Sequence, residues 1–145
     1  MTIGLLKDIA ENRPRNVRLL GMDIGKKTIG LAVCDPAQSL ATPLQTLKRT
    51  KFTKDMIRMQ AIDKDYEVGG FVLGLPLRDF ALELVRYPDV VGENPWVALQ
   101  DERFSTVSAD NLVDGAVSKR KAKEKGITDM LAAQVILQSA LDVLD

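Results

Sequence analysis

The sequence predicts an α/β fold in which a mixed five-stranded sheet carries helices on both faces. Three strand-like segments follow one another early in the chain, at residues 17–22, 28–34 and 41–47. Two more, at 69–75 and 96–99, alternate with segments of helical period. Consecutive strands favour antiparallel pairing, whereas strands separated by helices favour parallel pairing. The first three strands are therefore expected to be antiparallel and the last two parallel.

The start of the chain, residues 1–16, is expected to form a short helix. Leu5, Leu6 and Ile9 share one helical face there, and Pro14 follows them. This segment carries no chemistry of its own.

Residues 17–35 predict a β-hairpin whose first strand ends in a carboxylate. The first apolar run leads directly into Asp23, and the second is rich in β-branched and aliphatic residues. Between them, Gly25 is expected to supply a positive φ, with Lys26 and Lys27 at the exposed tip. Asp23 is then either a functional acid at the end of a strand or the cap of its own turn.

The next two strands are expected to differ in their surroundings. Pro43 within the run 41–47 favours an edge position, because proline donates no backbone hydrogen bond. The continuous apolar run 69–75 is typical of a strand buried on both faces. It is expected to lie centrally and parallel to the first strand.

A helix is predicted between these strands, from Lys51 to Tyr66. Its apolar residues recur at helical spacing, and their stripe is expected to pack in the core. Charged residues, among them Asp55 and Asp63, lie elsewhere around the helix.

After the buried strand, residues 77–87 are expected to form a helix and residues 89–95 a loop. The strand at 96–99 then runs into two acids, Asp101 and Glu102. Side chains alternate between the faces of an extended segment, so only one of the two can lie beside the acid of the first strand. Glu102 is expected to be that residue.

The final helix is expected from Asp129 to about Val143. Its polar stripe should face water and consists of Gln134, Gln138, Asp142 and Asp145. Asp129 lies almost opposite this stripe and should point toward the sheet, where a carboxylate must be paired, protonated or metal-bound. The alternative is an acid that only complements the helix dipole, with Thr128 as the N-cap.

Composition excludes several classes of site. The 145 residues include 20 Lys and Arg, 20 Asp and Glu, one cysteine and no histidine. Ser-His and Cys-His nucleophilic sites, histidine-ligated zinc and thiolate cages are therefore excluded. Any catalysis must use carboxylates, hydroxyls, lysine or tyrosine, and carboxylates suit Mg²⁺ or Mn²⁺.

The length fits one domain, residues 1–145, that can bury a core. No apolar run approaches the roughly 20 residues that span a bilayer. The opening residues show no signal-peptide pattern, and Cys34 has no partner for an internal disulfide. A soluble cytoplasmic protein is expected.

Three acids are predicted to converge at the carboxyl edge of the sheet: Asp23, Glu102 and Asp129. Ligands of mixed α/β sheets gather at that edge. Three carboxylates suit two divalent cations, Mg²⁺ or Mn²⁺, that flank a phosphodiester and activate the attacking water. These residues are the predicted catalytic and metal-binding groups.

Positive charge is concentrated near this predicted site. Basic runs are often only solvated surface, but next to a metal site they favour contacts with phosphate. The predicted nucleic-acid contacts are Lys26, Lys27, Arg103, Lys119, Arg120 and Lys121.

Five motifs, in this order along most of the chain, resemble the YqgF family of bacterial proteins with an RNase H-like fold. They are LLGMDIGKKTIGLAVCDP, ATPLQTL, VGGFVLGLPL, DERFST and TDMLAAQVILQSALD. The resemblance implies a nuclease, either in 5′-end maturation of pre-16S rRNA during ribosome biogenesis or as a Holliday junction resolvase. Carried over by motif, the acidic residues of the family fall on Asp23, Glu102 and Asp129, the three that spacing also selects.

One segment departs from the family pattern. After Leu77 the family continues Asn-Met-Asp-Gly, whereas this chain has Arg78 to Ala81, and the stretch up to Asp101 is shorter than usual. The substrate contacts and helix length of this segment therefore do not carry over.

Two other classes of function compete with a nuclease. A catalytically silent binding module would keep the fold and the basic segment, but retention of all three acids argues against it. An actin- or Hsp70-like ATPase would use Asp23-Ile24-Gly25 to bind phosphate, but it needs two related lobes and this chain has room for one. The residues leave open structured RNA or a DNA junction as substrate, and a monomer or a homodimer.

Overall fold

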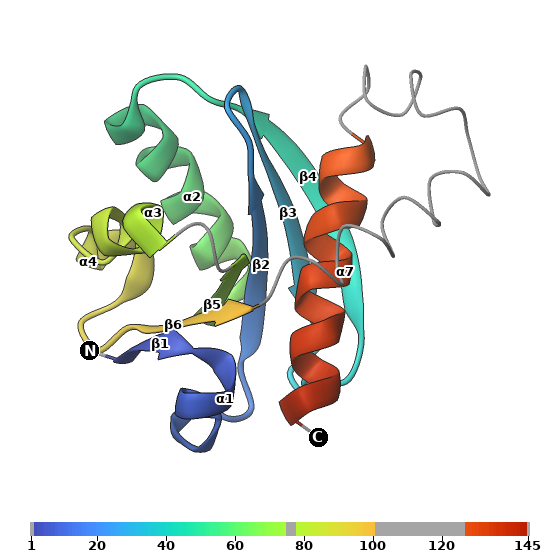
Figure 1. The fold of residues 1–145 in the computed structure, drawn as a ribbon. Helices are drawn as coiled ribbons and strands as arrows, with labels where there is room; N and C mark the ends of the chain where they lie inside the picture. The colour runs from blue at the N-terminus through green and yellow to red at the C-terminus, as the bar shows by residue number, and fades with distance from the viewer. Residues whose placement is uncertain (1, 75–77, 101–126, 145) are drawn as a thin grey trace.

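The computed structural model describes residues 2–74, 78–100 and 127–144. Its centre is a six-stranded sheet with the order β1-β6-β5-β2-β3-β4 (Figure 1). The strands are β1 (Thr2–Leu5), β2 (Arg18–Ile24), β3 (Thr28–Cys34), β4 (Ala41–Lys48), β5 (Val68–Gly74) and β6 (Trp96–Gln100). The helices are α1 (Leu6–Ile9), the 3₁₀ helix η1 (Ala10–Asn12), α2 (Phe52–Tyr66), α3 (Arg78–Leu84), α4 (Pro88–Val91) and α7 (Ile127–Leu144).

The strand pairing confirms the predicted mixed sheet. β2 and β3 form the antiparallel hairpin, and β3 pairs antiparallel with β4. β5 lies between β2 and β6 and runs parallel to both, as its apolar run predicted. β4 lies at the edge of the sheet, the position that Pro43 favoured.

The prediction of a helix at the start of the chain is wrong for its first residues. Thr2–Leu5 form β1, which pairs parallel with β6 and adds a sixth strand to the five expected. The helix begins only at Leu6, which is buried together with Ile9. An edge strand of four residues is too short to show a clear period, and the open edge of β6 supplies its hydrogen bonds.

The predicted loop at residues 89–95 is also partly wrong, because Pro88–Val91 form helix α4. Proline stands in the first turn, where its missing N–H costs no hydrogen bond. Val90 and Val91 are buried, and Gly92 ends the turn with a φ of 83°. Proline and glycine in this stretch favoured a loop, but burial of the two adjacent valines stabilises a helical turn instead.

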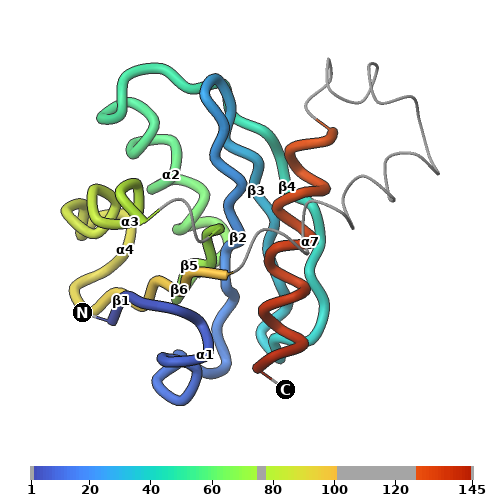
Figure 2. Tube along the Cα trace, in the orientation of Figure 1, coloured from blue at the N-terminus to red at the C-terminus, as the bar shows by residue number. Residues whose placement is uncertain are grey.

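Helices cover both faces of the sheet, as predicted (Figure 2). One face packs against α2, α3 and α4 and includes Leu20 and Met22 of β2. The other packs against α1 and α7 and includes Leu19. Side chains alternate along a strand, so the odd-numbered residues of β2 point to the α7 face. This alternation decides where the acid near the end of β2 points.

Helix α7 has 18 residues and is apolar enough to cross a membrane by length and composition alone. It packs on the sheet instead, with Ala133, Ile136 and Leu137 buried against it. A Cβ on Gly21 of β2 would lie only 2.7 Å from Leu137 Cβ, so the helix rests closely on the strand. We therefore interpret α7 as a core helix of the domain.

Candidate active site at the carboxyl end of β2

The first turn of α7 lies directly on β3, and Gly30 allows this contact. A Cβ on Gly30 would lie 2.1 Å from the backbone oxygen of Asp129 and 2.9 Å from Asp129 Cβ. No side chain tolerates such distances, so the close approach requires glycine. Figure 1 shows the first turn of α7 at the same end of the sheet as the turn between β2 and β3.

The side chain of Asp129 points toward the sheet, as its position on the helix predicted. The Thr28 hydroxyl of β3 donates a hydrogen bond of 2.9 Å to Asp129 Oδ2. The alternative, in which Thr128 is the N-cap and Asp129 only complements the helix dipole, does not fit, because the helix begins at Ile127. Within the described part of the chain, the buried Thr128 hydroxyl has no hydrogen-bond partner. Asp129 is thus held against β3 and does not merely face solvent in the first helical turn.

Asp23 lies next to this contact by the register of the hairpin. Asp23 of β2 is directly opposite Gly30 of β3. Opposed residues of an antiparallel pair project from the same face, and here that is the α7 face. Gly30 has no side chain, and Asp129 occupies the space above it. The structure therefore brings two of the three predicted acids to one face of one strand pair.

The third predicted acid, Glu102, lies outside the described residues, as do Asp101, Arg103, Lys119, Arg120 and Lys121. The last described residue before them, Gln100, pairs with Gly74 at the carboxyl end of β5. Trp96 and Ala98 belong to the cluster beneath α7, so Gln100, next in the alternation, points to that face too. The described residues alone contain no group of three acids, cysteines or histidines that could hold a metal ion.

The tip of the hairpin carries the two predicted lysines, Lys26 and Lys27, and both are exposed. The expected positive φ at Gly25 is wrong, because Gly92 is the only glycine with a positive φ in the described ranges. The turn is held instead by a hydrogen bond of 2.8 Å from the Gly25 N–H to the Thr28 oxygen.

Arg49 is a residue of this tip that sequence reasoning missed. Its Nη1 donates to the Gly25 oxygen at 2.8 Å, and its backbone N–H donates to the Lys27 oxygen at 2.8 Å. The register of β3 with β4, which pairs Thr28 with Lys48, brings it there. A single arginine that follows a strand belongs to no periodic pattern, so the sequence does not mark Arg49 as functional. Only the predicted antiparallel pairing of the first three strands indicated that the end of the third strand lies near the hairpin tip.

A pocket of about 550 Å³ lies beside the tip, on the α2 side of β2. Phe52 and Phe80 line it with ring centroids 5.3 Å apart, and the Arg49 guanidinium lies 5.7 Å from the centroid of Phe80. Lys26 adds an exposed cation at its rim. Aromatic rings, the cations Lys26 and Arg49, and two further acids, Asp79 and Glu83, therefore flank the hairpin on the face opposite to Asp23 and Asp129.

The polar stripe of α7 does not simply face water, contrary to the prediction. Gln134 Nε2 donates to the Ala41 oxygen at 3.1 Å, and the Ala41 N–H donates to Gln138 Oε1 at 2.8 Å. Two glutamines thus bind both backbone groups of the first residue of edge strand β4. Asp142 is exposed, as predicted, and Asp145 lies outside the described residues.

Comparison with known sequences identifies relatives along nearly the whole chain. The profile of the RuvX family, described as Holliday junction resolvase, matches residues 17–143. A protein of Rhodospirillum centenum is 39% identical over 157 residues, which cover 99% of this chain and 83% of that protein. A protein of Beijerinckia indica subsp. indica is 43% identical over 138 residues, covering 88% and 81%. Both relatives bear the name "Putative pre-16S rRNA nuclease".

Solved structures confirm the predicted RNase H-like type of fold. The large terminase nuclease of thermophilic phage G20c has a TM-score of 0.55 at 17% identity, covering 88% of this chain and 83% of that one. The Fowlpox virus resolvase, solved with Holliday junction DNA, has a TM-score of 0.53 at 13% identity, covering 88% and 99%. The profile match and the two relatives together show that this chain belongs to the RuvX family of Holliday junction resolvases, the family that its motifs resemble under the name YqgF.

Proposed function

We propose that this protein is a metal-dependent nuclease that hydrolyses phosphodiester bonds of structured nucleic acid. The observation that carries the proposal is the placement of Asp23 and Asp129 on one face of the hairpin, with Gly30 between them. Membership of a family named for nucleases agrees with that chemistry. Cytoplasm, where RNA precursors and chromosomal DNA are found in bacteria, is the proposed location.

Asp23, Glu102 and Asp129 are the residues proposed to hold the metal. Carboxylate oxygens are hard donors that Mg²⁺ and Mn²⁺ prefer, and the chain offers no histidine or thiolate cage in their place. When bound, a pair of such ions would activate water and stabilise the leaving oxygen. The Thr28 hydroxyl fixes the orientation of the Asp129 carboxylate, which is the role that partners of metal ligands commonly have.

Glu102 is proposed as the third acid on the basis of strand alternation. Gln100 points to the α7 face, and Glu102 follows two positions later. An extended continuation of β6 would put Glu102 on the same face as Asp23 and Asp129 and Asp101 on the opposite face. Glu102→Gln should then abolish cleavage, whereas Asp101→Asn should leave most of it.

Cationic residues around the hairpin are proposed to bind the phosphate backbone. Lys26 and Lys27 are exposed at the tip, and Arg49 is fixed beside them. Arg103, Lys119, Arg120 and Lys121 are proposed to extend this surface. Contacts of this kind position the substrate without reading its sequence.

A precursor of 16S rRNA is the proposed substrate, because the relatives with 39% and 43% identity are named for it. A four-way DNA junction is the second candidate, favoured by the description of the family profile. Cleavage of both substrates, in EDTA and with Mg²⁺ or Mn²⁺, separates the two.

Asp129→Asn should be inactive on whichever substrate the parent cuts. Asp142→Asn provides the matched control, because it removes the same charge from an exposed position on the same helix. Equal cleavage by both variants would contradict the assigned site. Tight binding of RNA or DNA without cleavage in any metal would instead establish a catalytically silent module.

A further inference from the structure

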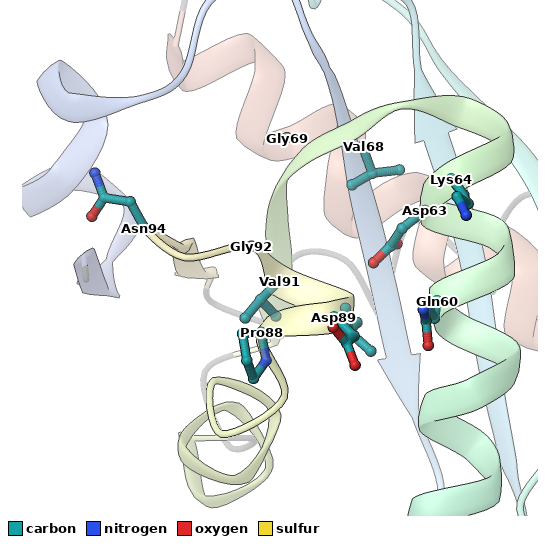
Figure 3. A pocket seen from close by; sticks show the side chains of 11 residues that line it. Gln60, Asp63, Lys64, Val68, Gly69, Pro88, Asp89, Val91, Gly92 and Asn94 are labelled. Atoms are coloured by element: carbon teal, nitrogen blue, oxygen red, sulfur yellow. The ribbon is translucent and has the colours of Figure 1, made fainter.

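A second pocket lies at the end of the sheet where β5 begins, opposite to the end that carries Asp23 and Asp129. It has a volume of about 400 Å³ and is formed between α2, the start of β5 and the segment of α4, residues 88–94 (Figure 3). Val68 and Gly69, which line it, are the first residues of β5, whereas the proposed active site lies at the carboxyl ends of the strands. The two sites are therefore separate.

Asp63 is the unusual residue of this pocket. Only 8% of it is exposed, and neither of its carboxyl oxygens has a hydrogen-bond partner in the described part of the chain. Buried polar groups are nearly always paired, so an orphan of this kind requires an explanation. Figure 3 shows its side chain reaching from α2 toward the segment that carries Asp89 and Val91.

Asp55, the other buried aspartate of α2, has a structural role that its hydrogen bonds explain. Asp55 is 2% exposed, and its carboxylate accepts hydrogen bonds from the backbone and hydroxyl of Thr50 and pairs with Arg58. These donors keep its pKa below the ordinary value despite burial. Asp63 has no such donors among the described residues, so no hydrogen bond or ion pair within this part of the chain explains why it is buried.

The rest of the lining indicates the type of group that fits. Val68, Val90 and Val91 provide apolar walls, and the charged residues that line the pocket are Asp63, Lys64 and Asp89. A buried carboxylate favours a cation, and aliphatic walls favour a cation carried on a hydrocarbon chain. A divalent metal fits less well, because the described residues here hold no third acid.

We propose that this pocket binds the end of an alkyl-ammonium or alkyl-guanidinium group, and that the Asp63 carboxylate, whose oxygens are shielded from solvent in this structure, turns toward the cation and pairs with it. Free polyamines and the side chains of lysine or arginine in a protein partner share this chemistry. The methylene groups would contact the valines, and Asp89 at the exposed rim would guide the cation inward.

Proton release provides a signature of this pairing. Burial raises the pKa of Asp63 to about 8, so near neutral pH the empty pocket holds mostly the protonated acid. A bound cation favours the ionised form, so binding should release close to one proton. Affinity should rise as pH increases toward the pKa of Asp63 and level off above it.

Isothermal titration calorimetry of the full chain with agmatine tests the proposal, because agmatine carries both an ammonium and a guanidinium end. Titrations near neutral pH in two buffers of different ionisation enthalpy measure the released proton. Spermidine and a short arginine peptide form the other arms and distinguish a free polyamine from a protein side chain.

Asp63→Asn should weaken binding at least about tenfold and abolish proton release. Asp65→Asn is the matched control, because it removes the same charge from an exposed position on the same helix outside the pocket lining, and it should bind like the parent. Binding that persists in Asp63→Asn, binding without proton release, or no heat with any of the three probes at millimolar concentration would overturn the proposal. Thermal shifts of the parent protein with agmatine give a second measurement that needs no variant.

Discussion

Asp23 and Gly30 lie directly opposite each other in the β2–β3 hairpin, and the first turn of α7 occupies the space above Gly30. Because Gly30 has no side chain, α7 can approach β3 closely, and Asp129 then lies beside the Asp23 carboxylate. Thr28, two residues before Gly30 on β3, then bonds to the Asp129 carboxylate. The proposed site depends on this contact between a strand and a helix that are distant in sequence.

Gly30→Ala should displace the first turn of α7, because the new Cβ would lie 2.1 Å from the Asp129 oxygen. Overpacking of this kind costs about 1–3 kcal/mol of unfolding free energy, and cleavage should fall below detection. Gly25→Ala is the control: its Cβ would meet nothing closer than 3.6 Å, and its φ is not positive. Urea unfolding and cleavage assays of both variants check this, and an active Gly30→Ala protein would show that the helix contact is dispensable.

Thr28→Val should weaken divalent metal binding by roughly 10–100-fold while the fold is retained. Valine keeps the shape of threonine but removes the hydroxyl that bonds to Asp129 Oδ2. Thr28→Ser keeps the donor and should recover most of the affinity. Titration of cleavage rate against Mn²⁺ measures the effect, and equal metal dependence of the valine variant and the parent would exclude Thr28 from the site.

Asp129→Asn should be at least as heat-stable as the parent in EDTA, since it relieves repulsion between neighbouring carboxylates. It should also gain less stability when Mg²⁺ or Mn²⁺ is added, because removal of a ligand reduces binding to the native state. If Asp129 only complements the helix dipole, its neutralisation should cost about 0.3–1 kcal/mol with no change in the metal response. Thermal melts in EDTA and across a metal titration decide between the two.

The sequence predicted most of the architecture because the core elements have strong periods. β3 was predicted with the bounds it has, Thr28–Cys34, and the direction of Asp129 followed from helical spacing alone. β1 was missed because pairing with β6, not its own four residues, makes it a strand. Local periodicity does not reveal an available sheet edge.

Polar residues were predicted less well than apolar ones. Gln138 has the position of a solvent-facing residue on its helix, yet it bonds to Ala41 of β4. Asp63 is outside the apolar stripe of α2, yet it is buried under the segment of α4. Helical period gives the direction of a side chain, but the neighbouring element decides whether that direction leads to water.

The phosphate contacts proposed for the hairpin tip can be counted by their salt dependence. Lys26→Ala with Lys27→Ala should weaken nucleic-acid binding uniformly across sequences. The log-log slope of affinity against salt should flatten by about 0.7–0.9 for each phosphate that is no longer neutralised. Lys7→Ala with Lys64→Ala removes equal charge from exposed positions of α1 and α2 and should leave the slope unchanged. An unaltered slope in the first variant would make the tip ordinary solvated surface.

The buried acid of the second pocket should make stability fall as pH rises. Burial raises the pKa of Asp63 from 3.8 to about 8, so between these values the native state holds a proton that the unfolded state has lost. Unfolding free energy from this group should therefore decrease by up to about 1.4 kcal/mol per pH unit across that window. This contribution should be constant above the window, where neither state holds the proton, and below it, where both states do.

Asp63→Asn should remove this pH dependence and be the more stable protein at about pH 8, whereas Asp65→Asn should keep it. Urea unfolding of the three proteins at intervals from about pH 5 to pH 8 measures the difference, and parallel curves for the parent and Asp63→Asn would show that Asp63 is ionised in the native state throughout.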